Sequence, residues 1–376
     1  MQDKAIQTAL MGGVDWEEYL RLVDRHRTPA LSWAALKCTS DLQLPAKVQI
    51  EMQQRADRCR RVALRHIQLL TPLLRAFQKE DISVLCFKGP MLSDELYGDI
   101  GLRHSKDIDL QVREKDLSRV QVCLEGLGYH TDSSGAALTP REWAYYRVRD
   151  HQLDFVPNSG AGLVEIHWRN QWETPQQSQM LWNRASPSNW HGLSFLTMHR
   201  EDRLLYLCSH GAEHVWSRAK WLGDLARIMA DGELDWTSVL RTAQATHQDR
   251  ALLASLLLVS QCFGLPLPSI IQEAADGLHA TLLQLPVAML CTEEEAEVRH
   301  IGVRVRDGFR CLQYRRLLLP QHTWQMFWQD LTFSRRDFWR FRLADSHIWL
   351  YSLLRPVLWL GRRMKRARKQ YAKTTS

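Results

Sequence analysis

The sequence DIDLQV, at residues 107–112, alternates acidic or polar residues with apolar ones. A period of two predicts a half-buried β-strand, on which residues two positions apart point to the same side. Asp107 and Asp109 therefore project together, while Ile108 and Leu110 enter a core. Two carboxylates this close repel each other unless a cation lies between them, and Mg²⁺ binds such oxygen ligands together with substrate phosphates. Taken alone, such a stretch is more often a solvated strand face, and the alternative is a divalent-metal platform, which the neighbouring motifs favour.

A second strand is expected upstream at residues 82–87 (ISVLCF), which end at Lys88-Gly89-Pro90 before a helical stretch at residues 91–97. Glycine allows the backbone to approach a phosphate group closely, and a helix N-terminus offers unpaired N–H groups. We therefore expect Lys88 and Gly89 to contact phosphate groups. Pro90 offers such a ligand neither an N–H group nor a hydroxyl.

A third acid is expected from the downstream strand VEIHW, at residues 164–168. Residues 148–156 and 163–168 flank the turn sequence PNSG, which predicts an antiparallel pair. Glu165 lies between two apolar residues and takes the polar face of its strand. It would complete a cage of carboxylates with the two aspartates of DIDLQV, and Asp154 is the alternative third acid.

The rest of the chain is predicted to be mostly helical, with a break or a kink at Thr71-Pro72. We divide the whole chain into a helical region at 1–80, an α/β core at 81–196, a helical domain at 197–334 and an amphipathic, basic C-terminal segment at 335–376. Helices, then a small mixed sheet, then helices again predict the α+β class.

The ordered set of motifs resembles a known family. The set comprises FKG at 87–89, a tyrosine and an arginine downstream, DIDL at 107–110, VEIHW at 164–168, and HG-x(2)-H-x(5)-KWLGDLA from residue 210. It is similar to the bacterial uncharacterised nucleotidyltransferase family, which belongs to the DNA polymerase β-like superfamily. The resemblance covers the chain from Ala56 to Ala230 and implies a nucleotidyltransferase core within the α+β fold.

The resemblance also implies roles for site residues. Asp107, Asp109 and Glu165 would be catalytic metal ligands, and Lys88 and Gly89 would occupy the phosphate-loop position, with Mg²⁺ or Mn²⁺ as cofactor and an NTP as substrate. In such chemistry two metal ions about 3.5–4 Å apart hold the attacking and leaving oxygens. The chain departs from the superfamily at the residue after Gly89, where the superfamily has serine or glycine and this sequence has proline.

Further cations and histidines are candidates for the same site. Arg103 and Lys220 are candidate nucleotide-binding residues, and Arg103 has an ordinary ion pair as its alternative role. His151 and His167 are either structural or contact the acceptor.

The helix predicted after Thr197 presents one polar and aromatic face. If it is unbroken, at about 100° per residue, His210, His214, Trp221 and Asp224 fall within about 80° of arc. One interpretation is a lid that brings the neighbouring lysine to the phosphates and packs Trp221 near the base. A second is a zinc site formed by His210, His214 and Asp224, and a third is a purely structural role.

The charge of the chain is concentrated at its end. Lys plus Arg total 49 and Asp plus Glu total 42, and the last sixteen residues hold seven basic side chains and no acidic one. The remaining residues are therefore balanced, which argues against a nucleic-acid partner. The eight cysteines are too widely spaced for CxxC zinc or redox motifs, and with no signal-peptide pattern we expect a cytoplasmic chain.

The C-terminal run IWLYSLLRPVLWL, at 348–360, precedes the basic tail. It is too short to span a bilayer, but an apolar, Trp-rich and then basic segment fits a peripheral membrane anchor or a docking arm for an acidic partner. The alternative is a packed helix followed by a solvated tail.

Three functions follow from these observations. The first is metal-dependent transfer of an NMP from an NTP to a hydroxyl or phosphate of a protein, peptide or small-molecule acceptor. The second is a non-catalytic nucleotide- or partner-binding module with the same fold, which the Gly89-Pro90 sequence favours. The third is a zinc hydrolase built on His210 and His214.

Overall fold

The computed structural model describes residues 13–39, 42–131, 139–160, 162–170, 173–232, 234–276, 281–291 and 343–358, with the isolated positions 8, 278, 314, 316–319 and 338. Within these residues the strands form one seven-stranded sheet of order β3-β4-β5-β2-β1-β7-β6. The strands are β1 (Val84–Cys86), β2 (Ile108–Val112), β3 (Tyr129–Thr131), β4 (Gln152–Pro157), β5 (Val164–His167), β6 (Ser186–Trp190) and β7 (Leu193–Thr197).

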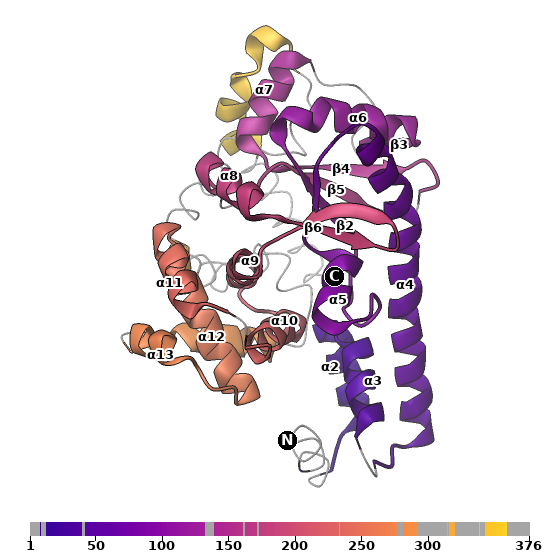
Figure 1. Cartoon of the computed structure of the whole chain (residues 1–376), viewed down its shortest axis with the longest axis vertical. Helices are drawn as coiled ribbons and strands as arrows, with labels where there is room; N and C mark the ends of the chain where they lie inside the picture. Colours follow the sequence, from indigo (N-terminus) through magenta and orange to yellow (C-terminus); the bar gives the residue numbers. More distant parts are fainter. Residues whose placement is uncertain are drawn as a thin grey trace, which may run out of the picture.

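Helices precede, interrupt and follow the sheet, so the expected class of helices around a mixed sheet is confirmed. The helices are α2 (Trp16–His26), α3 (Pro29–Cys38), α4 (Ala46–Lys79), α5 (Gly89–Tyr97), α6 (Leu117–Gly126), α7 (Pro140–Arg149), α8 (Pro175–Arg184), α9 (Arg200–Glu213), α10 (Ala219–Ala230), α11 (Trp236–Ala245), α12 (Asp249–Phe263), α13 (Ser269–Ala275) and α14 (Thr281–Leu290). In Figure 1, α4 runs along one side of the molecule and α11 to α13 lie on the opposite side, with α5 between them.

The sheet separates two apolar cores, because successive residues of a strand face opposite sides. On β1, Val84 and Cys86 join a core with α4 and α6, whereas Leu85 joins a core with α5 and helices α9 to α13. The second core ties the helical region to the sheet. A cleft between the sheet and the helical region can therefore be lined by side chains that both of them hold in place.

The central strands are mixed in direction. β2 is parallel to β5 and antiparallel to β1, and β4 is antiparallel to β5, which confirms the predicted antiparallel pair. The strand expected from residue 148 begins instead at Gln152. Residues 148–149 belong to α7, whose start is fixed by a capping box between Thr139 and Glu142.

The predicted break at Thr71-Pro72 is wrong, because α4 continues through both residues. The Thr71 hydroxyl donates to the carbonyl of Ile67, 2.8 Å away. Leu70 before Pro72 and Phe77 after it are both buried in the core beneath the sheet. Packing on both sides of the proline holds the helix together despite the hydrogen bond that the proline cannot donate.

The helix expected to run unbroken after Thr197 is interrupted between α9 and α10. Val215 and Trp216 both have φ of +50° and connect the two helices. The Trp216 ring is fully buried and lies against Gly211 of α9. Burial of this large ring turns the chain back on itself, an outcome that helical periodicity does not encode.

The N-terminal helices form a small core of their own against α4, which includes Leu20, Trp33 and Met52. Asp15 caps α2 by accepting hydrogen bonds from the backbone N–H groups of Glu17 and Glu18. Packing of α2 against α4 directs the C-terminal end of α2 toward the loop before α10. There Arg25 donates a hydrogen bond to the carbonyl of Ser217 at 2.8 Å.

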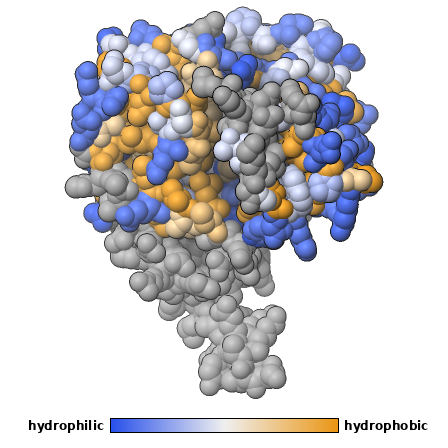
Figure 2. Space-filling model, turned by 90° about the horizontal axis from the view of Figure 1, so that it is seen from below, coloured by the Kyte–Doolittle hydropathy of each residue, from blue (hydrophilic) through white to orange (hydrophobic). Residues whose placement is uncertain are grey.

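Part of the molecular surface is apolar. Viewed from below, apolar side chains gather on the half of the molecule that contains the α12–α13 helices (Figure 2), and Phe263 at the end of α12 is 49% exposed. Residues 350–358 form a helix on which Leu353 and Val357 are also exposed. Residues 359–376, which include the basic tail, lie outside the described residues. Among the residues that the structure covers, no helix has the length and apolar character needed to cross a bilayer.

Candidate active site

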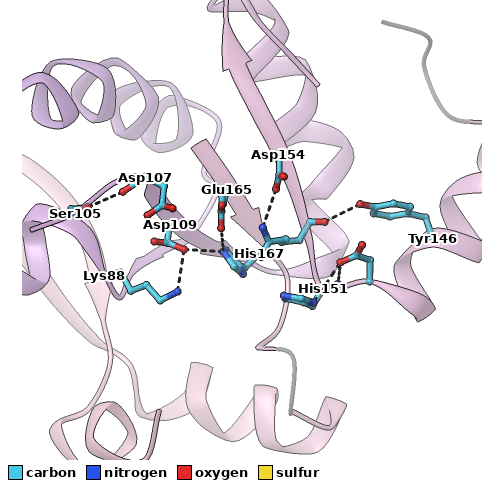
Figure 3. Close-up of polar contacts among 11 residues, drawn as sticks. Lys88, Ser105, Asp107, Asp109, Tyr146, His151, Asp154, Glu165 and His167 are labelled. Atoms are coloured by element: carbon cyan, nitrogen blue, oxygen red, sulfur yellow. Dashed lines mark hydrogen bonds and ion pairs between the residues drawn. The ribbon is translucent and has the colours of Figure 1, made fainter. Parts of the chain in front are cut away.

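The register of the sheet brings the predicted acids together. Asp109 on β2 lies directly opposite Glu165 on β5, and residues in register on neighbouring strands share a face. Asp107 immediately precedes β2, two residues before Asp109. Figure 3 shows the side chains of Lys88, Asp107, Asp109, Glu165 and His167 directed toward one common point.

Two basic side chains contact these acids. The Lys88 ammonium lies 3.2 Å from Oδ1 of Asp109, and Nε2 of His167 lies 3.2 Å from the same oxygen. The same Nε2 lies 3.5 Å from Oε2 of Glu165. Positive charge is therefore held among the carboxylates, as their mutual repulsion requires.

The ionisation of these groups is shifted by burial and by their neighbours. Burial opposes ionisation of Asp109, but Lys88 and then His167 outweigh it and hold the pKa of this carboxyl below its usual range. Burial, followed by the charges of Asp109 and Glu165, raises the pKa of Asp107 to about 6. Burial would lower the pKa of His167, but its hydrogen bonds to Asp109 and Glu165 outweigh this and raise the pKa.

The donor set fits a divalent metal ion. Among the described residues, one ligand atom each from Asp109, Glu165 and His167 lie within 4.8 Å of one another. Carboxylate oxygens and an imidazole nitrogen are common ligands of divalent ions. Asp107 is outside this tight group but lines the same cavity.

Asp154, the alternative third acid, also shares a register position with Glu165, on the β4 side. Its Oδ1 accepts a hydrogen bond from Nε2 of Gln152 at 2.9 Å. Glu165 lines the cavity beside the aspartates and Asp154 does not. The geometry therefore favours Glu165 as the third acid of the predicted set.

A cavity of about 540 Å³ opens in front of the acids. Its acidic side chains are Asp107, Asp109, Glu165 and Glu213. Among the described residues, the basic side chains outnumber them. They come from the end of α2, the loops beside β1 and β2, and the start of α10 with the loop before it, namely Arg25, Arg27, Lys88, Arg103, Lys106, Arg218 and Lys220. The cavity thus places an acidic patch beside a predominantly basic wall.

Gly89 lies at the boundary between the two sides, as the first residue of α5. Its φ is +67°, a conformation that side chains with a Cβ rarely adopt. The α5 N-terminus therefore opens onto the cavity next to Lys88, where its N–H groups favour an anion. This is the position that the sequence predicts for a phosphate-binding turn.

Arg103 lines the cavity but is held in a buried ion pair. Its Nε donates to Oδ2 of Asp224 at 2.8 Å, and the Tyr97 hydroxyl donates to the other oxygen at 3.0 Å. Asp224 is fully buried. The zinc set of His210, His214 and Asp224 is therefore not assembled, because this aspartate faces an arginine, and the ion pair foreseen for Arg103 is internal rather than on the surface.

Lys220 is buried and donates through Nζ to the carbonyl of His104 at 3.2 Å. Burial and then the charge of Arg103 lower its pKa well below the usual range. Burial and then Lys220 also lower the pKa of His104 to about 3. Burial is the larger cause of both shifts, and neighbouring positive charge adds to it.

Aromatic rings line the helical side of the cavity. His210 stacks on Tyr206 with ring centroids 5.8 Å apart, and His214 stacks on Trp221 at 5.1 Å. These residues meet because α9 packs against α10, although the helix that the sequence predicted through them is broken. His210, Glu213 and His214 also bring ligand atoms within 4.8 Å of one another. Burial and then the charge of Lys88 lower the pKa of His210.

Several cavity residues were not predicted from the sequence, notably Arg25, Arg27, Tyr206 and Arg218. The two N-terminal arginines carry no local motif, and their place depends on how α2 packs on the loop before α10. For Arg218, the sequence held one indication of a place in the cavity, namely its position two residues before Lys220.

One family and two solved structures are similar to this chain. A search of curated proteins finds no match. The solution structure of the antibiotic-resistance factor ANT(2'')-Ia aligns with a TM-score of 0.35 and 15% identity, over 49% of this chain and 92% of that one. The crystal structure of ANT(2")-Ia in complex with adenylyl-2"-tobramycin aligns with a TM-score of 0.34 and 16% identity, over 47% and 95%. Residues 12–264, well over half of the sequence, match the uncharacterised nucleotidyltransferase family, and the chain belongs to that family.

Proposed function

We propose that the protein is a divalent-metal-dependent nucleotidyltransferase, which moves an NMP from an NTP to a hydroxyl or phosphate of a protein, peptide or small-molecule acceptor. The observation that carries the proposal is the register of Asp109 with Glu165 at the floor of a cavity that has a basic wall. Membership of a nucleotidyltransferase family supports the same reaction class.

The acids would hold Mg²⁺ or Mn²⁺, with Asp107, Asp109 and Glu165 as ligands. Divalent ions at such a site neutralise charge on the transferring phosphoryl group and orient the attacking and leaving oxygens. Lys88 is bonded to Asp109 and borders Gly89 at the α5 N-terminus. From there the Lys88 ammonium can bind a phosphate oxygen once a divalent ion neutralises the charge of Asp109.

The basic wall would bind the triphosphate. Among the residues that the structure describes, seven lysine and arginine side chains line the cavity against four carboxylates, so a polyanion is favoured over a neutral ligand. Trp221 and His214 offer a stacked pair of rings on the helical side, a surface that suits a flat base. Arg103 is fixed by Asp224 and presents its remaining N–H groups from a rigid position.

The reaction follows from this placement. The acceptor oxygen bonds to the α-phosphorus while the bond from that phosphorus to the bridging oxygen of the leaving pyrophosphate breaks. The acceptor proton passes to a carboxylate oxygen of Glu165, which is more exposed than Asp109 (18% against 4% for the side chains). Lys88 and the arginines balance the charge of the departing pyrophosphate, and Lys220 offers it an N–H donor.

The proposal is tested by incubating the purified protein with labelled NTPs, Mg²⁺ or Mn²⁺, and fractions of cell extract that contain small molecules, peptides or proteins. We expect metal-dependent nucleotide binding and a labelled product, both lost in Asp109→Asn. Asp154→Asn is the matched control, because Asp154 lies on the neighbouring strand outside the cavity, and it should behave as the wild type. Absence of nucleotide binding and of product with every NTP would overturn the proposal.

One observation favours the alternative of a non-catalytic module with the same fold. Pro90 stands near the start of α5, where it removes one N–H group from the phosphate-binding turn. The two functions separate in cells that carry Asp107→Asn together with Asp109→Asn. Loss of the cellular function is expected for the enzyme, and its full retention would favour the binding module.

A further inference from the structure

We propose that the imidazole of His167 is a direct ligand of the metal ion in this site, so that the centre has mixed nitrogen and oxygen ligands. The inference rests on the proposed function, which places a divalent ion among the acids. It adds a residue outside the predicted acid cage and changes the class of metal that the site prefers.

The first support is geometric. His167 follows Glu165 by two residues on β5, so both side chains share the face of the sheet on which Asp109 lies. Nε2 of His167 lies 3.2 Å from Asp109 and 3.5 Å from Glu165. One atom from each of the three residues lies within 4.8 Å of the others, the spacing of ligands around a single ion.

The second support is the fixed orientation of the ring. His167 is 4% exposed, and its ring meets the Phe87 ring edge to face, with centroids 5.4 Å apart and planes at 88°. Packing of this kind holds Nε2 toward the carboxylates. A ligand that is oriented before the ion arrives has less conformational entropy to lose on binding.

The third support is a comparison with Lys88, which contacts the same Asp109 oxygen at 3.2 Å. A lysine ammonium at this place acts as a counter-charge, since it has no lone pair with which to bind a metal. A neutral imidazole carries such a lone pair. When an ion is bound, Lys88 is therefore displaced toward phosphate, whereas His167 remains as a ligand.

The consequence is a change in metal preference. Oxygen ligands alone suit Mg²⁺, whereas imidazole nitrogen suits first-row transition ions. We infer that the site prefers a first-row transition ion to Mg²⁺, and that His167 carries this preference.

The experiment uses Mn²⁺ as a paramagnetic probe on the full-length protein. Pulsed electron paramagnetic resonance of the Mn²⁺-loaded protein should show ¹⁴N modulation, which should change to the ¹⁵N pattern when the histidines are ¹⁵N-labelled. The modulation should disappear in His167→Gln. It should persist in His151→Gln, the matched control, because His151 lies 5.8 Å from His167 between ring centroids and contacts Asp150. The excess of Mg²⁺ needed to displace Mn²⁺ should fall about tenfold in His167→Gln.

Each outcome has a distinct meaning. Bound Mn²⁺ without histidine coupling in the wild type, or coupling that persists in His167→Gln, overturns the inference and leaves the proposed function standing. Failure of the wild type to bind Mn²⁺ contradicts the proposed function as well. If His167→Gln does not fold, the ¹⁵N-labelled wild type still shows whether histidine binds the ion. Coupling retained in His151→Gln, His210→Gln and His214→Gln then assigns it to His167 among the cavity histidines, and its loss in any of them overturns the assignment.

Discussion

Nε of Arg103 donates to the carboxylate of Asp224 at 2.8 Å, and this buried pair joins the loop before β2 to helix α10. Its two side chains are 5% and 0% exposed. The pair therefore fixes the basic wall of the cavity relative to the sheet that carries the acids. Its contribution is structural as well as electrostatic.

Removing one partner of this pair should strongly destabilise the protein. Asp224→Ala leaves Arg103 buried without its counter-charge, and we expect the free energy of unfolding to fall by about 3–5 kcal/mol. The matched control is Arg60→Gln, which breaks the more exposed pair with Asp99 and should cost less than about 1 kcal/mol. Urea denaturation followed by circular dichroism measures both. Equal effects of the two variants would contradict the structural role of the buried pair.

Gly89→Ala should weaken nucleotide binding. A Cβ at this position fits the space, because its nearest neighbours are 3.7 and 3.8 Å away, but φ of +67° costs about 1–2 kcal/mol for a residue with a side chain. Relief of that strain shifts the turn that faces the cavity. Gly98→Ala tests the same strain at the other end of α5, where φ is +69° and a Cβ meets nothing within 4 Å. We expect similar losses of stability in the two variants, and weaker binding of a non-hydrolysable NTP, measured by calorimetry, in Gly89→Ala alone.

The break between α9 and α10 gives a packing prediction. A Cβ at Gly211 would overlap the Trp216 ring, so Gly211→Ala should lower the free energy of unfolding by about 1–3 kcal/mol. Gly223→Ala, in α10, meets only the Tyr97 hydroxyl at 3.8 Å and should be neutral or stabilising, since alanine favours helix interiors. Thermal unfolding of the two variants tests the contrast. A stable Gly211→Ala protein would show that the Trp216 ring is placed elsewhere.

His26 gives a pH dependence of stability. Burial, followed by the charges of Arg25 and Arg21, lowers its pKa from 6.5 to about 4, and its Nδ1 accepts a hydrogen bond from the N–H of Ala219 at 3.2 Å. Between pH 6.5 and 4, His26 is therefore protonated in the unfolded chain but neutral in the folded chain. The stabilising contribution of neutral His26 is fully present above pH 6.5 and is lost as the pH falls toward 4. The slope due to this group is at most about 1.4 kcal/mol per pH unit.

The measurement is urea unfolding at several pH values between 7 and 4. In His26→Gln, which keeps an acceptor but does not titrate, stability should fall less steeply over that interval than in the wild type. Parallel curves for the two proteins would show that His26 is not held neutral.

The central strands and the acids on them were predictable because they depend on local patterns. DIDLQV and VEIHW alternate at period two, and the ordered motifs assign them to neighbouring strands of one family fold. The turn at Gly89 was predictable because a glycine follows a strand and precedes a helix, whereas its role in binding phosphate stays a prediction.

Other features depend on contacts between distant segments. β6 has no alternating apolar residues, so the strand is defined by its pairing with β7 rather than by its own sequence. Arg25 reaches the cavity through a bond to Ser217, a residue 192 positions away. Asp224 would share a face with His214 if the helix were unbroken. The turn at Trp216 separates the two helices, and Asp224 pairs with Arg103 instead.

The central claim is that Asp109 and Glu165 hold divalent ions for a nucleotide bound along the basic wall. The most direct measurement is a crystal structure of the protein with Mn²⁺ and a non-hydrolysable NTP, with the metal located by anomalous scattering. The account predicts Mn²⁺ bound to both carboxylates, Lys88 moved from Asp109 to a phosphate oxygen, and the triphosphate beside the α5 N-terminus. A nucleotide bound outside the cavity, with the Lys88–Asp109 pair intact and no metal between the acids, would contradict it.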